Sequence, residues 1–209
     1  MEISISNIAW DINLDREIIS ILGKKNIRFV DIAPSKYFKN IFNATKEDIF
    51  QVRDLWLEAG INIYGMQSLL FGKDEYNIFS NQNEQDKLIN YLEYVFKIGN
   101  LLGVKKIVFG SPKNRNKKNL DQSLALKIAI NFFQRLSYIA DKYQLIICLE
   151  PNPIEYGCNF LNSTEETANI VKLINKKSVM LQFDLGSIII NGEDINEICE
   201  KYYKLVSHI

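Results

Sequence analysis

The feature that most constrains the fold is a regular alternation of short apolar runs and longer amphipathic segments along the chain of 209 residues. Each amphipathic segment carries apolar residues three or four positions apart, as a helix requires. The short runs are almost continuously apolar, which is typical of parallel strands covered on both faces. The predicted strands are residues 3–10, 27–33, 61–68, 104–110, 145–150, 179–184 and 205–209. The predicted helices are residues 15–25, 45–59, 84–102, 120–143, 163–174 and 195–203.

Two parallel α/β folds fit this alternation: an open doubly wound sheet and a β/α barrel. A doubly wound nucleotide-binding sheet requires a glycine-rich loop after its first strand, but Ala9, Trp10 and Asp11 follow Ile8 here. A barrel of the TIM type requires eight β/α units, and this chain supplies about six and a half of them. We therefore predict an α/β fold of the parallel (β/α) TIM-barrel type, as a single incomplete domain over residues 1–209, truncated at its C-terminal end.

The composition excludes several classes of protein. Lys and Arg number 25, and so do Asp and Glu, so the net charge is zero, with 47% hydrophobic and 24% charged residues. Such a chain is neither disordered nor basic enough to indicate a nucleic-acid partner. No apolar run reaches the roughly 18 residues of a membrane helix, and no signal peptide begins the chain. We expect a cytoplasmic protein with a small-molecule partner and reduced cysteines.

Polar residues follow nearly every predicted strand, at the end where α/β folds carry their chemistry. The clearest case is Glu150, which ends a strand without any other charge and shares a face with Ile146 and Cys148. Asp184 repeats this pattern one strand later. The candidate substrate-binding residues at these strand ends are Asn7, Trp10, Asp31, Gln67, Ser111, Lys113, Arg115, Asn152 and Tyr156.

Two acids on neighbouring strands and the only histidine on the next strand form a possible metal site. Glu150, Asp184 and His208 supply the carboxylate and imidazole ligands that divalent ions such as Mn²⁺, Zn²⁺ or Mg²⁺ accept. Glu150 is also a candidate general base. The alternatives are a structural ion pair for Glu150 and a solvent-exposed terminal position for His208.

A basic loop follows the fourth predicted strand. Its cations Lys113 and Arg115, next to Ser111, could clamp the anion of a sugar phosphate. The alternative is an ordinary solvated loop, because Lys117 and Lys118 continue the basic run.

Several strand-end segments resemble those of sugar phosphate isomerase/epimerase-like proteins in the xylose-isomerase-like barrel superfamily. The most specific is Leu149-Glu150-Pro151-Asn152-Pro153 with the following Glu155-Tyr156-Gly157-Cys158-Asn159-Phe160 and Ser163-Thr164. Phe183-Asp184-Leu185-Gly186 resembles the sixth-strand motif of that superfamily, Val108-Phe109-Gly110-Ser111-Pro112 the fourth and Asp31-Ile32-Ala33-Pro34 the second.

The resemblance implies a barrel with one divalent metal (Mn, Zn, Mg or Co), held by Glu150, Asp184 and His208 together with a glutamate on the eighth strand. It also implies a sugar or sugar-phosphate isomerase or epimerase that moves a proton next to a carbonyl through an enediolate. The chain departs from the pattern at two points. Ser187 stands where many members have histidine, and the eighth-strand glutamate has no counterpart, so weak metal binding and impaired turnover are expected.

Two other functions can be compared with the pattern, and the first fits it better than the second. A non-catalytic binding or scaffold protein derived from the barrel would explain Ser187 and the missing strands. An endonuclease acting on abasic DNA, also found in this superfamily, requires a histidine-rich cluster for several metals, which one histidine cannot form. An open barrel also leaves strand edges and apolar surface uncovered, so we expect the chain to form a homo-oligomer, to aggregate, or to fold only as part of something larger.

Overall fold

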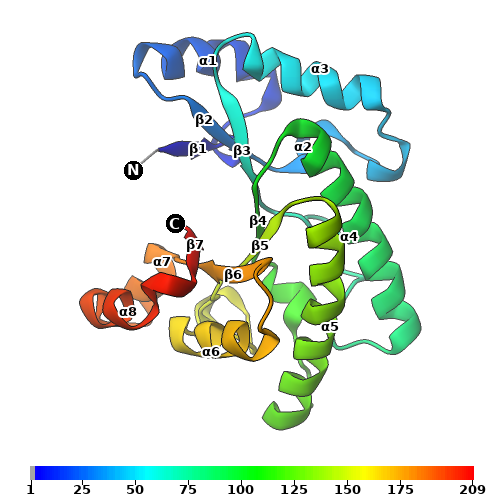
Figure 1. The fold of residues 1–209 in the computed structure, drawn as a ribbon, viewed down its shortest axis with the longest axis vertical. Coiled ribbons are helices and arrows are strands. Elements are labelled where there is room, and N and C mark those ends of the chain that lie inside the picture. Colours follow the sequence, from blue (N-terminus) through cyan, green and yellow to red (C-terminus); the bar gives the residue numbers. More distant parts are fainter. Residues whose placement is uncertain (1–2) are drawn as a thin grey trace.

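The computed structural model describes residues 3–209 and contains one parallel sheet. Within these residues the sheet has seven strands in the order β1-β2-β3-β4-β5-β6-β7, each paired in parallel with the next (Figure 1). The predicted incomplete α/β barrel is thereby confirmed. The strands are β1 (Ser4–Ser6), β2 (Phe29–Ile32), β3 (Asn62–Met66), β4 (Lys106–Phe109), β5 (Ile146–Leu149), β6 (Val179–Gln182) and β7 (Val206–His208).

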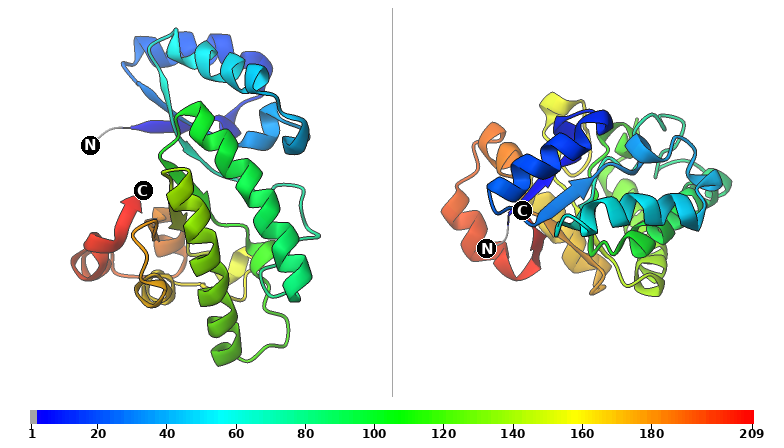
Figure 2. Two further views of the ribbon diagram at one scale, coloured as in Figure 1. Left: turned by 45° about the vertical axis from the view of Figure 1, so that its right-hand side comes forward. Right: turned by 90° about the horizontal axis from the view of Figure 1, so that it is seen from above.

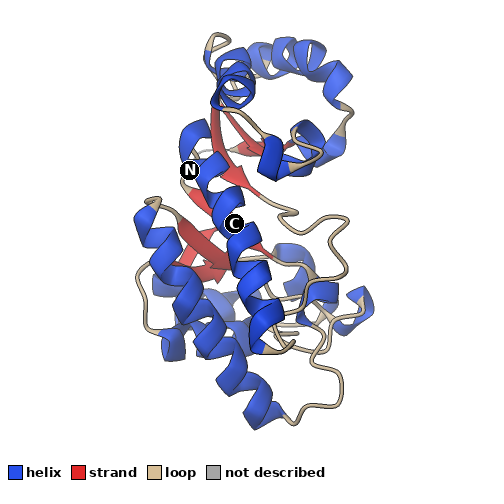
Figure 3. Ribbon diagram, turned by 90° about the vertical axis from the view of Figure 1, so that its right-hand side faces the viewer, coloured by secondary structure: helices blue, strands red, loops and turns tan. Residues whose placement is uncertain are grey.

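Helices follow the strands and cover the outer face of the sheet. The long helices α4 and α5 pack side by side and stand in front of the strands in Figure 3. All six predicted helices are present, and the structure adds α2 and α7, which are too short to show a periodic pattern. The helices are α1 (Asp15–Lys24), α2 (Pro34–Tyr37), α3 (Lys46–Leu57), α4 (Gln82–Leu102), α5 (Gln122–Lys142), α6 (Thr164–Ile174), α7 (Leu185–Ile190) and α8 (Ile195–Tyr202).

Each of the seven strands is shorter than predicted, and polar side chains account for the early end of the first and the sixth. The first was predicted over residues 3–10, but Ser6 Oγ accepts a hydrogen bond from the Ile8 amide and turns the chain into a 3₁₀ helix, Asn7–Ala9. The sixth was predicted to reach Asp184. Instead, Asp184 is the N-cap of α7, and its Oδ1 accepts a hydrogen bond from the Gly186 amide. A hydrogen-bonding side chain thus competes with the strand backbone in both places.

Helix ends follow local capping rules. At the start of α3, Thr45 and Asp48 form a capping box, in which each side chain accepts from the other residue's amide. At the start of α6, Ser163 Oγ accepts from the Glu166 amide, but the Glu166 carboxylate accepts from the Asn162 amide and not from that of Ser163, so the spacing of a capping box is present without its second hydrogen bond. The carboxylate reaches one residue further back than the motif specifies.

The Thr45 cap gives a measurable contribution to stability. We expect Thr45→Ala to lower the free energy of unfolding by about 1 kcal/mol, because the Asp48 amide loses its acceptor at a helix start. Thr45→Ser keeps the hydroxyl and should remain close to wild type. Urea unfolding followed by circular dichroism measures both variants, and equal losses in the two would contradict the capping role.

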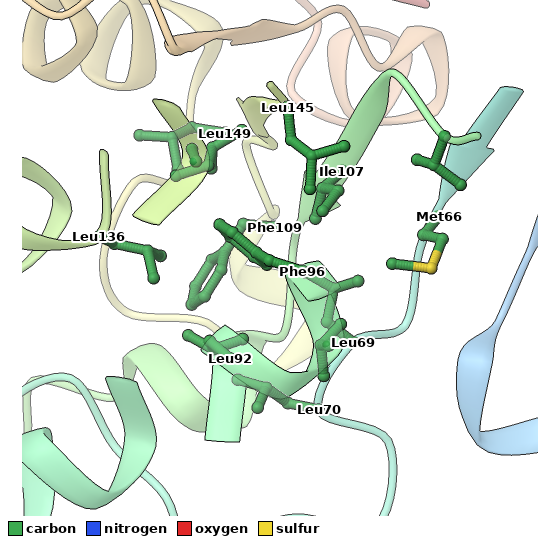
Figure 4. Close-up of a cluster of buried hydrophobic side chains, with 14 of the residues drawn as sticks. Met66, Leu69, Leu70, Leu92, Phe96, Ile107, Phe109, Leu136, Leu145 and Leu149 are labelled. Atoms are coloured by element: carbon green, nitrogen blue, oxygen red, sulfur yellow. The ribbon is translucent and has the colours of Figure 1, made fainter. Parts of the chain in front are cut away.

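The main core lies between the sheet and the long helices. Figure 4 shows Phe96 of α4 beside Phe109 of β4, with Met66 and Ile107 close by. These four side chains are almost fully buried. Gly99 lets α4 approach the sheet, because a Cβ there would lie 2.9 Å from Met66 Cε. Alternate residues of each strand point away from these helices and therefore line the interior of the curved sheet.

Two further expectations concern membrane-spanning helices and the state of the cysteines. No helix in residues 3–209 has both the length and the apolar character needed to cross a membrane. The three cysteines are free, as predicted, with Cys148 and Cys158 buried and Cys199 exposed. Burial raises the pKa of Cys148 to about 12, so this interior thiol stays protonated at neutral pH.

Candidate functional site

A pocket of mixed polar and apolar lining lies at the carboxyl ends of β3, β4 and β5, where parallel strands present their loops on one side. Its volume is about 510 Å³. The pocket brings together five of the predicted site residues, which are Gln67, Ser111, Lys113, Glu150 and Asn152.

Glu150 is the central acid of this pocket. It follows the last residue of β5, and its amide donates to the Phe109 carbonyl of β4. This hydrogen bond fixes the backbone position from which the Glu150 side chain extends. Its Oε2 accepts a hydrogen bond of 3.3 Å from Asn152 Nδ2. A Cβ at Gly110 would collide with Glu150 Oε2, so this carboxylate occupies the space that the missing side chain leaves. The position of the acid thus depends on a glycine of the neighbouring strand end.

The electrostatic surroundings favour the protonated form of this acid. Burial is the largest cause that raises the pKa of Glu150 above its usual range, and the nearby Asp184 carboxylate adds to it. The Arg115 guanidinium, the Asn152 hydrogen bond and His208 act in the opposite direction. A glutamate with a raised pKa is suited to general acid and base catalysis near neutral pH.

The raised pKa predicts how stability depends on pH. The folded chain binds the Glu150 proton more tightly than the unfolded chain, so this residue costs stability once the pH rises above about 4.3, the ordinary glutamate pKa. We expect Glu150→Gln to unfold at a higher temperature than wild type at pH 7. That advantage should shrink towards pH 4, where the carboxyl is protonated in both states. Thermal unfolding by circular dichroism across this range measures it, and an advantage that grows towards acid would contradict the assigned burial.

Asp184 and His208 both lie close enough to influence Glu150, but neither lines the pocket. Asp184 Oδ1 caps α7. His208 Nε2 lies 3.1 Å from Asp31 Oδ2, and the side chains of these two residues are only 12% and 11% exposed. His208 is therefore not a solvent-exposed terminal residue. Tyr64 of β3 stacks on the imidazole, with ring centroids 6.3 Å apart.

These side chains do not fit a metal site as they are arranged. Within residues 3–209, no three His, Cys, Asp or Glu side chains come together closely enough to hold a metal ion. Asp31 contacts one imidazole nitrogen of His208, and one oxygen of Asp184 caps α7. The charge of Asp184 raises the pKa of Glu150.

The predicted anion clamp is divided between a buried and an exposed cation. Arg115 is fully buried, and none of its three guanidinium nitrogens has a hydrogen-bond partner among the described residues. Lys113 is exposed and forms an ion pair of 2.8 Å with Asp74. Ser111 has a left-handed backbone with φ of 51° at the turn into the 3₁₀ helix Pro112–Arg115. Lys113 alone of the two cations lines the pocket.

The remaining predicted residues lie outside this pocket. Asn7 is buried, and its Oδ1 accepts from the Ala33 amide, so it joins the ends of β1 and β2. Trp10 donates from Nε1 to Asp15 Oδ1 at 2.7 Å and is part of the packing above β1. Tyr156 is half exposed in the 3₁₀ helix Ile154–Tyr156.

Sequence reasoning missed the residues that support the predicted ones. Gly110 makes room for Glu150, and Gly65 makes room for Asp31, whose Oδ1 would lie 2.5 Å from a Cβ at that position. Ser6 Oγ accepts a hydrogen bond from Gln67 Nε2. The only signal in the sequence was a glycine at or near the end of a predicted strand, which indicates a close approach without naming the partner.

Comparison with known proteins agrees with the architecture. The family model of the xylose isomerase-like TIM barrel matches residues 16–209. This chain belongs to that family. A search of the curated proteins found no match.

Solved structures with the same fold include epimerases. D-psicose 3-epimerase in the presence of D-fructose is 15% identical, with a TM-score of 0.81 over 100% of this chain and 72% of that one. The 3-keto-D-glucoside 4-epimerase from E. coli is 15% identical, with a TM-score of 0.77 over 100% and 77% of the two chains. IolI protein with a bound zinc atom is 17% identical, with a TM-score of 0.71 over 94% and 67%.

Proposed function

We propose that this chain is a sugar or sugar-phosphate isomerase or epimerase that moves a proton next to a carbonyl group. The observation that carries the proposal is Glu150, a partly buried carboxylate with a raised pKa in a pocket of mixed polar and apolar lining at the carboxyl ends of the strands. Membership of the family and the two epimerases of the same fold support it.

The proposed step needs one group to accept the proton and others to orient the sugar. Glu150, when ionised, removes the proton from the carbon next to the carbonyl, and the electron pair forms an enediolate. A proton also passes from the hydroxyl oxygen on that carbon to the former carbonyl oxygen, and the protonated Glu150 returns its proton to the former carbonyl carbon, which completes an isomerisation. Epimerisation needs a second acid on the opposite face of the sugar. The amides of Gln67 and Asn152 and the hydroxyl of Ser111 line the same pocket and are suited to sugar hydroxyls.

The charged residues extend the proposal to phosphorylated sugars. Lys113 at the pocket wall would pair with a phosphate in exchange for the exposed Asp74. Arg115 lies behind the pocket near Glu150 and adds positive charge to that region. Asn7, Trp10, Asp31 and Tyr156 lie outside this pocket, so no contact with the bound sugar is assigned to them.

The assay that tests the function uses a small panel of ketoses. The chain is incubated with D-fructose, D-tagatose and D-fructose 6-phosphate, and the products are separated by chromatography. Conversion of at least one sugar, lost in Glu150→Gln, is the expected result. A folded chain that converts none of these ketoses would contradict the proposed substrate class.

A divalent metal held by Glu150, Asp184 and His208 remains part of the proposal, because the resemblance implies it and the IolI structure contains zinc. No step is derived through a metal, since the present arrangement does not gather these ligands. We expect calorimetric titration with Mn²⁺ or Zn²⁺ to give a dissociation constant of about 1 mM or weaker, because the candidate ligands are not gathered into one cluster. Tight binding that Glu150→Gln leaves unchanged would contradict the ligand assignment.

The missing ligand cluster favours one alternative function. A non-catalytic binding protein that keeps the barrel scaffold would bind a sugar in the same pocket without converting it. Sugar binding detected by calorimetry, without any conversion in the ketose assay, would identify that alternative.

A further inference from the structure

An exposed aromatic ring lines the pocket that holds Glu150. Phe71 is 74% exposed, more than any other aromatic side chain in residues 3–209, and it lines this pocket together with Glu150. It lies in the long connection from β3 to α4, which is coloured blue-green in Figure 2. A single exposed apolar side chain is common on protein surfaces, so exposure alone does not assign it a role.

The backbone around Phe71 is anchored on both sides of the ring. Leu70, directly before it, is only 2% exposed and belongs to the main core. Asn114, in the loop after β4, donates from Nδ2 to the carbonyls of Lys73 and Tyr76, each at 2.8 Å. The ring therefore projects from a turn that neighbouring elements hold in place, so its exposure at the pocket is a fixed feature of the fold.

The strand order separates Phe71 from Glu150 within the pocket. Phe71 follows β3 and Glu150 follows β5, and β4 lies between these two strands in the sheet. Neighbouring strands are about 4.8 Å apart, so β3 and β5 are roughly 10 Å apart. A six-carbon sugar with its carbonyl end at Glu150 would therefore direct its far carbons towards Phe71. A four-carbon sugar has no carbons there.

The chemistry of the ring differs from that of the other groups around the pocket. The amides of Gln67 and Asn152 and the hydroxyl of Ser111 can form hydrogen bonds with sugar hydroxyls. Phe71 is the only aromatic residue among the described residues that line this pocket, and it has no polar atom in its side chain. The face of an aromatic ring is apolar and carries a partial negative charge, which suits the C–H groups of a sugar.

We propose that Phe71 is a specificity-determining residue, which packs against the C–H groups of the sugar carbons farthest from the carbonyl. The site then prefers six-carbon ketoses to four-carbon ones. This inference rests on the proposed function, because it places the carbonyl end of the sugar at Glu150. The contact acts equally on the bound sugar and on the transition state, since the ring does not touch the reacting carbons. Its loss should therefore raise KM and leave kcat unchanged.

The test compares the binding of D-fructose, with six carbons, and D-erythrulose, with four. Ligand-observed NMR titration gives both dissociation constants, and saturation-transfer NMR shows which sugar protons contact the protein. We expect Phe71→Ala to weaken D-fructose binding by about 10-fold, a loss typical of one aromatic contact, and to leave D-erythrulose binding unchanged. Saturation transfer to the protons on C5 and C6 of D-fructose should fall in the same variant. Phe71→Tyr keeps the ring and should bind D-fructose as wild type does.

A matched control removes an exposed ring elsewhere. Tyr138 of α5 is 64% exposed and does not line the pocket, so Tyr138→Ala should bind D-fructose as wild type does. Circular dichroism checks that each variant folds. Unchanged D-fructose binding in Phe71→Ala would overturn the proposal, and so would an equal loss for the two sugars, because Phe71 would then not distinguish sugar length.

The outcomes also separate this inference from the proposed function. If ketose conversion depends on Glu150 but Phe71→Ala has a wild-type KM for D-fructose, the inference fails and the proposed function stands. If D-fructose binding depends on Phe71 but no ketose is converted, the role of Phe71 stands and the catalytic function fails. A folded wild-type chain that binds neither sugar would overturn both.

Discussion

Replacing Glu150 with glutamine is expected to lower the rate of ketose conversion by about 10²- to 10⁴-fold, the usual contribution of a positioned general base. Glutamine keeps the size of the side chain but cannot accept a proton. The hydrogen bond with Asn152 can persist, because the amide oxygen remains an acceptor. The loss should therefore appear in kcat, with little change in KM.

A matched control separates this chemical effect from damage to the fold. Glu155→Gln makes the same substitution in the adjacent 3₁₀ helix, on an exposed side chain outside the pocket. It should retain wild-type kcat. If Glu150→Gln and Glu155→Gln had equal kcat, Glu150 would not be the base.

The second large effect is expected at Gly110. Adding one methyl group in Gly110→Ala forces the Glu150 carboxylate out of its present position, since the new Cβ would overlap Oε2. We expect a loss of no more than about 1 kcal/mol in the free energy of unfolding, at the low end for overpacked sites, because the atom that must move is the far end of a flexible side chain. Conversion of ketoses should fall as well, because the base is displaced. Denaturant unfolding and the ketose assay measure the two effects.

Two further variants show whether the loss comes from this contact. Gly23→Ala adds the same methyl group within α1, where nothing lies within 4 Å, and should stabilise the chain by up to about 1 kcal/mol. The double variant Gly110→Ala, Glu150→Ala shortens the acid. Its loss in free energy of unfolding should be smaller, by at least about 0.5 kcal/mol, than the sum of the losses in the two single variants. Strict additivity would show that Gly110 is needed for another reason.

The positions of the strands and helices could be predicted because hydrophobic periodicity is a local property. Their ends were less predictable. Ser6 ends a strand, and Asp184 begins the helix after one. Each does so through a side-chain hydrogen bond, which a pattern of apolar residues does not reveal. The short helix α7 was missed for a different reason. Its six residues give too few turns to establish a period.

The candidate site was predictable residue by residue but not as an arrangement. The strand-end rule correctly brought Glu150, Gln67 and Lys113 to one pocket. It could not show that His208 would pair with Asp31, because that contact joins the second and seventh strands across the curved sheet. Contacts of this kind depend on the closure and stagger of the strands, which no local pattern encodes.

The central claim is that Glu150 exchanges a proton at the carbon next to a sugar carbonyl. The most direct measurement is proton NMR of D-fructose, D-tagatose and D-fructose 6-phosphate incubated with the chain in D₂O. We expect at least one sugar to lose its signal from a proton next to the carbonyl as deuterium enters, even where net conversion is slow. Glu150→Gln should not support this exchange. A folded wild-type chain that exchanges no such proton, or a Glu150→Gln variant that exchanges it at the same rate, would contradict the claim.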